Sequence, residues 1–146
     1  AIRDELLPMA DLATPNAFEL GWLTGQPVGS TDQAHQAAQS IGIADVIATS
    51  VRVDTNTIAN VLSGRSGAIA CTTPLRGGVP HGTGDLFAAL VLGHVLANRP
   101  HAEAVARATA GASLVIDASI GRDELSLVAT LPGALAASPG ACEPAA

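Results

Sequence analysis

The segment Gly82-Thr83-Gly84-Asp85 has the residue types that phosphate chemistry requires. It lies between a loop that contains glycine and proline and a long apolar run that predicts a buried helix. The first turn of a helix exposes unpaired N–H groups and the positive end of the helix dipole, and glycines let an anion approach them closely. The segment can therefore hold a phosphate, or the charge that develops on one during transfer.

Asp85 is the residue of this segment that can act as a base. It precedes Leu86 and Phe87 at the start of the predicted helix, so its side chain is expected to point from a buried element into a cleft. A carboxylate there can accept the proton of an alcohol during phosphoryl transfer. The alternative is structural: Gly82 and Gly84 form a tight turn and Asp85 caps the helix. The pattern leaves both open, because short glycine motifs match many unrelated loops.

A second polar group, Thr14-Pro15-Asn16 with Glu19, follows a short predicted strand. Asn16 at the N-cap and Glu19 three residues later have the spacing of a capping box, which is the structural interpretation. The functional interpretation uses the same place, because strand carboxyl ends in open α/β sheets face the ligand crevice. A carboxylate there can hold Mg²⁺ beside substrate phosphates, usually through water.

The elements that must position these groups alternate between helix and strand patterns. Helices are predicted at residues 2–9, 16–24, 30–42, 84–97, from Pro100 onward and at 123–130, and strands at 11–14 and 45–49. Two β-branched runs, 51–62 and 68–73, are separated by the turn residues 63–67 and predict an antiparallel hairpin. This order predicts an α/β layer sandwich with a mixed sheet.

Composition excludes several classes of function. The chain has 146 residues and a net charge of −6, with only seven Lys and Arg, so the basic face of a nucleic-acid binder is missing. An apolar fraction of 48% with 14% charged residues argues against a disordered chain. The longest apolar stretch, 86–97, is too short to cross a membrane, and the first residues lack the pattern of a signal peptide.

The two cysteines, Cys71 and Cys142, are isolated in the sequence and form no CxxC or Cys/His cluster. A structural zinc site is therefore not expected, and free thiols in a reduced, cytoplasmic protein are the simplest interpretation.

Three blocks of this sequence closely resemble pyridoxal kinases, a family of the ribokinase-like superfamily. They are Leu7 to Gly25, Ala48-Thr49-Ser50 and His81 to Ala89, in the family's order. The resemblance runs from Ile2 to about Asp117 and corresponds to the C-terminal half of the family's domain. It implies the C-terminal portion of a ribokinase-like three-layer sandwich, with a mixed, mostly parallel sheet, a β-hairpin and flanking helices. We expect this domain at 1–132 and a disordered Ala-, Pro- and Gly-rich tail at 133–146.

The resemblance also implies a role for each matching residue. Asp85 corresponds to the catalytic base that deprotonates the hydroxymethyl oxygen of pyridoxal, and Gly82, Thr83 and Gly84 correspond to the anion hole. Thr14 and Glu19 correspond to the metal site. The residues that correspond to ATP contacts are Asn16, Glu19, Thr49, Ser50, Arg76, Gly77, Gly78 and Thr83.

The implied co-substrate is ATP with Mg²⁺, and a monovalent cation is a further possibility. The implied substrates are pyridoxal, pyridoxine or pyridoxamine in cytoplasmic vitamin B6 salvage, and the family is typically homodimeric. Related hydroxymethylpyrimidine kinases tend to carry Cys where Asp85 stands, and sugar kinases usually carry Gly-Ala-Gly-Asp.

The family's N-terminal half, with most of the substrate pocket and its lid, has no counterpart in this sequence. Three hypotheses therefore stay open: a vitamin B6 kinase, a kinase for another small alcohol, and a non-catalytic binding module.

Overall fold

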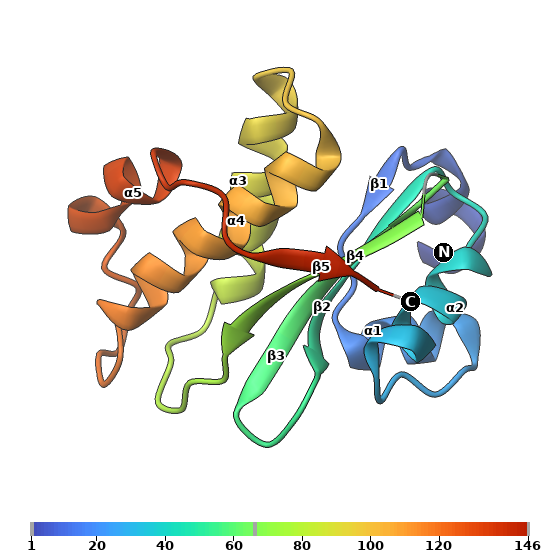
Figure 1. Ribbon diagram of the computed structural model, residues 1–146, viewed down its shortest axis with the longest axis horizontal. Helices are drawn as coiled ribbons and strands as arrows, with labels where there is room; N and C mark the ends of the chain where they lie inside the picture. Colours follow the sequence, from blue (N-terminus) through green and yellow to red (C-terminus); the bar gives the residue numbers. More distant parts are fainter. Residues whose placement is uncertain (1, 66, 146) are drawn as a thin grey trace. The chain divides into compact units, whose positions relative to one another are not determined.

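The computed structural model describes residues 2–65 and 67–145. Five strands in this part of the chain form one sheet in the order β1-β2-β3-β4-β5 (Figure 1). The chain divides into two compact units, and the division falls inside β4 (Gly67–Pro74). The first unit runs to Ala70 and includes the segment from Cys142 onward, and the second comprises Cys71–Ala141.

The helices of the first unit begin and end at the residues that the sequence marks. Asn16 is the N-cap of α1, and the helix stops at Gly25, which has a left-handed φ of 71°. Ser30 starts α2 by accepting a hydrogen bond from the backbone N–H of Gln33. The helical segments of this unit are η1 (Ile2–Leu6), η2 (Leu7–Met9), α1 (Ala17–Thr24) and α2 (Thr31–Gln39).

The strands of the first unit differ from the prediction in one boundary. β1 (Leu12–Ala13) runs parallel to β2 (Asp45–Arg52), which is antiparallel to β3 (Thr57–Gly64). The prediction of a break after residue 49 is wrong, because β2 continues and turns only at residues 53–56. There the Asp54 carboxylate accepts a hydrogen bond from the Asn56 N–H at 2.7 Å, which is ordinary turn chemistry. The predicted hairpin corresponds to β3 and β4, which are neighbours in the sheet.

Small side chains hold the first unit together. α2 packs against β2 and β3 (Figure 1), and alanines on its inner face allow the backbones to approach closely. Burial of each core valine contributes about 1.5 kcal/mol or more. The fully buried members of this core include Leu20, Ala34, Ala37, Val46, Ala48, Val51, Ala59 and Val61.

The second unit contains three helices, α3 (Thr83–Leu96), α4 (His101–Asp117) and α5 (Leu127–Leu135). α3 and α4 lie side by side, and α5 packs on α4 (Figure 1). A Cβ on Gly111 would stand 2.5 Å from the carbonyl oxygen of Ala134, so only glycine permits this contact between α4 and α5. The last helix starts later than the predicted residue 123, because Ser119 accepts a hydrogen bond from the Ser126 N–H and holds a turn there.

The C-terminal segment contains more structure than its composition suggested. Residues from Gly133 onward, predicted to be a disordered tail, include the end of α5 and the strand β5 (Cys142–Pro144). The Ala145 N–H donates to the Ala68 carbonyl oxygen at 3.0 Å. Cys71 and Cys142 are both disulfide-bonded, so the prediction of free thiols is wrong. No described helix is long and apolar enough to cross a membrane.

Candidate functional site

The amino end of α3 has no side-chain cap. Gly82 is the N-cap residue, with a φ of 94° in the left-handed region that glycine adopts without strain. The first bond of the helix runs from the Leu86 N–H to the Gly82 carbonyl oxygen at 2.9 Å. The N–H groups of the three residues before Leu86 therefore have no partner in the helix. A Cβ on Gly84 would meet nothing within 4 Å, so the space beside this turn is open.

Asp85 is the third residue of α3, and its side chain is exposed. Its carboxylate makes no hydrogen bond or ion pair within the described part of the chain. Leu86 and Phe87 are 8% and 5% exposed, so packing fixes the start of the helix. No bond to a described residue fixes the Asp85 carboxylate. The helix cap that was the structural alternative for Asp85 is therefore absent. A carboxylate in this place can accept a proton from an alcohol that attacks an anion at the helix end.

The amino end of α1 is closed by the predicted capping box. The Asn16 Oδ1 accepts a hydrogen bond from the Glu19 N–H at 2.9 Å, and the Glu19 Oε2 accepts one from the Asn16 N–H at 2.8 Å. The structural interpretation of this pair is thereby confirmed. Glu19 is exposed, and its second oxygen, Oε1, makes no hydrogen bond to a described residue.

Thr49 and Ser50 form an irregularity in β2 that the sequence did not reveal. The pairing with β3 passes from Ala48 directly to Val51, so these two residues bulge out of the ladder. Ser50 has a φ of 57°, which is strained for a residue with a side chain. Backbone strain of this kind is concentrated at functional sites. The Thr49 N–H donates to the Pro15 carbonyl oxygen at 2.8 Å, and Thr49 forms a parallel bridge with Asn16.

The loop that contains Arg76, Gly77 and Gly78 is attached to the end of α4. Arg76 forms a two-point ion pair with Asp117, and the Gly78 carbonyl oxygen accepts a hydrogen bond from the Gly121 N–H at 3.0 Å. Sequence reasoning missed Asp117, because nothing in a helical pattern links it to a loop so far away along the chain.

Each unit brings some of the predicted site residues together. In the first unit, Thr14, Asn16 and Glu19 lie in one short segment, and the bridge between Asn16 and Thr49 places the bulge of β2 beside it. In the second unit, the Arg76 loop is bonded to Asp117, and the Leu125 Cδ1 lies 3.7 Å from the place where a Cβ on Gly82 would stand.

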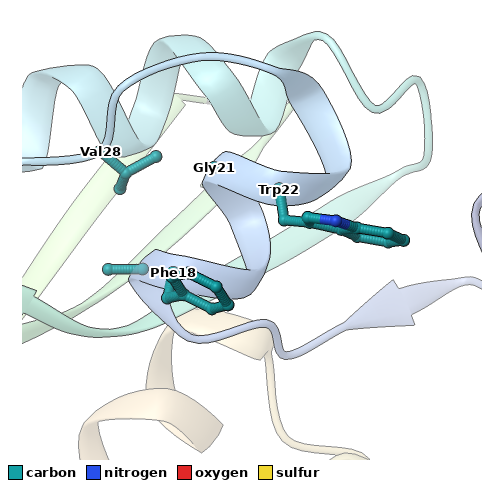
Figure 2. A pocket seen from close by; sticks show the side chains of 5 residues that line it. Phe18, Gly21, Trp22 and Val28 are labelled. Atoms are coloured by element: carbon teal, nitrogen blue, oxygen red, sulfur yellow. The ribbon is translucent and has the colours of Figure 1, made fainter.

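An apolar hollow on α1 was not predicted. Ala17, Phe18, Gly21, Trp22 and Val28 line it. Figure 2 shows the Phe18 ring and the Trp22 indole projecting from α1, with Val28 on the other side of Gly21. Phe18 is 81% exposed and Trp22 is 67% exposed, so neither ring is packed into the core of the first unit. With no charged side chain in its lining, the hollow does not suit a phosphate.

The residues predicted for Mg²⁺ suit indirect binding better than a metal cage. Among residues 2–65 and 67–145, no group of three or more His, Cys, Asp or Glu side chains could hold a metal ion. Mg²⁺ usually keeps several waters and needs only one or two carboxylates beside substrate phosphates. The unpaired oxygen of the exposed Glu19 fits that requirement.

Comparison with known proteins gives consistent matches. The family model of phosphomethylpyrimidine kinase matches residues 1–126. Pyridoxal kinase PdxY of Corynebacterium diphtheriae is 36% identical over 133 residues, which cover 87% of this chain and 47% of that protein.

Solved structures match nearly the whole chain. The pyridoxal kinase of Entamoeba histolytica matches with a TM-score of 0.88 and 25% identity, over 98% of this chain and 55% of that one. The pyridoxal kinase of Leishmania donovani, in complex with ADP and pyridoxine, matches with a TM-score of 0.83 and 29% identity, over 96% and 53%. The chain thus spans about half the length of these relatives, and the predicted α/β fold is confirmed.

Proposed function

The chain belongs to the phosphomethylpyrimidine kinase family and shares the ribokinase-like fold of pyridoxal kinases, and we propose that it carries the phosphoryl-transfer part of an ATP-dependent kinase. The proposed acceptor is the 5′-hydroxymethyl group of pyridoxal or a related vitamin B6 vitamer. Relatives named as pyridoxal kinases support this substrate class. Since the chain spans about half of their length, the activity of the whole protein is part of the proposal.

The open amino end of α3 is the observation that carries the proposal. A helix end with no side-chain cap, glycines at its first turn and an unpaired carboxylate at its third residue combines an anion site with a base. The N–H groups of Thr83 and Gly84, with the turn at Gly82, form the proposed anion hole for the transferred phosphoryl group.

The proposed reaction needs one base and one anion site. The Asp85 carboxylate takes the proton of the hydroxymethyl group while the hydroxymethyl oxygen forms a bond to the γ-phosphorus of ATP. The bond from that phosphorus to the bridging oxygen breaks, and ADP leaves with the electron pair. The N–H groups of α3 stabilise the charge on the phosphoryl oxygens in transit.

The proposed ATP contacts come from loops and strand ends. Thr49 and Ser50 leave the β2 ladder, so we assign their hydroxyl groups to the phosphates, while the Thr49 N–H stays bonded to the Pro15 carbonyl oxygen. Asn16 stands beside Thr49. In the second unit, we assign the loop of Arg76, Gly77 and Gly78, together with Thr83, to ATP contacts.

Mg²⁺ is proposed to accompany the nucleotide, with Glu19 and Thr14 serving it. When bound, the ion would neutralise the phosphate charges. Glu19 would act through its Oε1 while Oε2 keeps the helix cap. A monovalent cation remains a prediction from the resemblance alone.

Two other functions stay open. Another small alcohol could replace the vitamer, because the family model that matches is named for a different kinase. A non-catalytic binding module is the second, and it would bind ATP without turnover. Homodimer formation and a role in cytoplasmic vitamin B6 salvage are part of the proposal of a vitamin B6 kinase. The disulfide-bonded cysteines are more usual in oxidising compartments.

Substitution of the base tests the proposal. In the longest natural polypeptide that carries these residues, Asp85→Asn should lower the turnover of pyridoxal by about 10²-fold or more, because general base catalysis contributes that much. The affinity for ATP should survive. Asp32→Asn is the matched control, since Asp32 is an exposed acid in the first turn of α2.

Turnover of Asp85→Asn near the parent level would overturn the assignment of the base. Absence of turnover in the unmodified protein with pyridoxal, pyridoxine and pyridoxamine, but turnover with another alcohol, would overturn the substrate. ATP binding without turnover of any of these alcohols would favour the non-catalytic module.

A further inference from the structure

Asp117 occupies an unfavourable place for an acid. It is the last residue of α4, where the unpaired carbonyl groups and the negative end of the helix dipole lie. Its side chain is 53% exposed, so burial does not keep it there. The position calls for a cationic partner that offsets the repulsion from the helix end.

Arg76 is that partner, and its guanidinium is almost fully occupied. Its Nε and Nη2 donate to the two carboxylate oxygens of Asp117, with Nη2 and Oδ2 at 2.8 Å. Its Nη1 donates to the Thr73 Oγ1 at 2.9 Å and to the Pro74 carbonyl oxygen at 2.8 Å. The Arg76 side chain is only 17% exposed. Two-point pairing of this kind fixes direction as well as distance.

A second link lies one helical turn before Asp117. The Ser113 and Thr73 hydroxyl groups are 2.8 Å apart, and Thr73 also holds Arg76. The end of β4 and the last turn of α4 are therefore connected through two side chains of α4, Ser113 and Asp117.

The same loop is attached to the residues that follow α4. The Gly121 N–H donates to the Gly78 carbonyl oxygen at 3.0 Å. The Leu125 Cδ1 lies 3.7 Å from the place where a Cβ on Gly82 would stand. Buried Ser119 holds this segment in shape, because its hydroxyl donates to Val115 and accepts from the Ser126 N–H. The loop thus follows the segment 117–125 as far as the start of α3.

We propose that Asp117 is a positioning residue that fixes the nucleotide loop, residues 76–79, through the guanidinium of Arg76. In this role Arg76 serves ATP by anchoring the loop, because four of its hydrogen bonds already go to the protein. The role in nucleotide binding rests on the proposed function, whereas the anchoring of the loop does not.

Amide hydrogen exchange tests the anchor directly. Asp117→Asn should raise the exchange rate of the Gly121 N–H and of the loop amides by about fivefold, the value for loss of one well-formed, partly exposed ion pair. The dissociation constant of a fluorescent ADP analogue should rise by a similar factor. Asp123→Asn is the matched control, since it removes the same charge from the segment without touching Arg76.

Exchange of the charges of Arg76 and Asp117 distinguishes loss of the anchor from a general effect of changed charge. Asp117→Arg alone should weaken loop protection further, because two cations then face each other. Addition of Arg76→Glu should restore both protection and analogue affinity toward the parent values.

Parent-level loop protection in Asp117→Asn, or no recovery in the reversed pair, would overturn the inference. If the unmodified chain binds no ADP analogue, the proposed function fails instead, and hydrogen exchange still decides whether Asp117 anchors the loop. A higher dissociation constant of the ADP analogue in Asp117→Asn, without any change in loop protection, would also count against the anchor.

Discussion

The amino ends of α1 and α3 have the same sequence spacing and opposite structures. In both helices an acid stands three residues after the N-cap: Glu19 after Asn16, and Asp85 after Gly82. Glu19 folds back onto the N-cap N–H and completes a capping box. Asp85 makes no such bond, and its helix end stays open. The same arrangement closes one helix and leaves the other available to a ligand.

The chemistry of the two N-cap residues explains part of this difference. Asn16 supplies a side-chain oxygen and has an extended backbone with a φ of −74°, as a capping residue requires. Gly82 supplies no side chain, and its φ of 94° turns the chain into the helix from another direction. The Asp85 side chain is also one methylene shorter than that of Glu19.

Burial explains the rest. α1 has eight residues and buries only Leu20, so its stability depends on its caps. α3 has fourteen residues and buries five of them along one face, and it packs against α4. A helix fixed by its core can leave its first N–H groups unpaired, and those groups then remain for an anion.

The largest expected effect comes from filling the open end of α3. Gly84→Ala should lower phosphoryl transfer by about 10²-fold, as removal of one donor from an anion hole does, because a methyl group blocks the approach. The free energy of unfolding should not fall, since the site has room and alanine favours a helix. Turnover and urea denaturation measure the two quantities.

Gly93→Ala is the control for that substitution. Gly93 lies in the same helix, and a Cβ there would also meet nothing within 4 Å. It should leave turnover unchanged. Equal turnover in Gly84→Ala and Gly93→Ala would show that the open amino end of α3 does not bind the transferred phosphoryl group.

A smaller effect is expected at the closed end of α1. Glu19→Gln should keep the capping box, because glutamine serves at that position, and should raise the Mg²⁺ concentration needed for half-maximal turnover by about tenfold. Glu19→Ala should also lower the free energy of unfolding by about 1 kcal/mol. Titration with Mg²⁺ and urea denaturation separate the metal role from the cap. An unchanged Mg²⁺ requirement in Glu19→Gln would leave Glu19 with the cap alone.

The smallest effect tests whether packing is what holds α3. The Nε2 of buried His94 has no hydrogen-bond partner among the residues that the structure describes. Burial lowers its pKa below the usual 6.5, and the charges of Arg99 and Arg107 add to this while Glu103 opposes it. The unfolded chain therefore binds a proton more readily, and the stability that neutral His94 provides is lost as the pH falls below about 6.5.

Urea denaturation at about pH 7.5 and about pH 5.5 measures this loss. His94→Leu should reduce the difference between the two conditions, whereas His81→Leu, in the exposed loop before α3, should retain it. An equal pH dependence in all three proteins would show that burial of His94 does not contribute.

Local patterns predicted much of the framework. The boundaries of α1 and α3 follow from Asn16, Gly25 and Gly82, because caps and glycines act within one turn of the chain. The start of α5 was missed, because the turn before it depends on the buried hydroxyl of Ser119. The disulfide-bonded state of Cys71 and Cys142 was missed because their surroundings depend on which strands become neighbours in the sheet.

The sequence by itself determined the family, the two acid-bearing helix starts and the residue types available at each. Tertiary structure decided which start would stay open, which strand would bulge at Ser50 and which acid would hold Arg76. The physical reason is range. Caps and turns are settled by residues three or four positions apart, whereas burial, strand register and the pairing of Arg76 with Asp117 arise only when distant segments pack together.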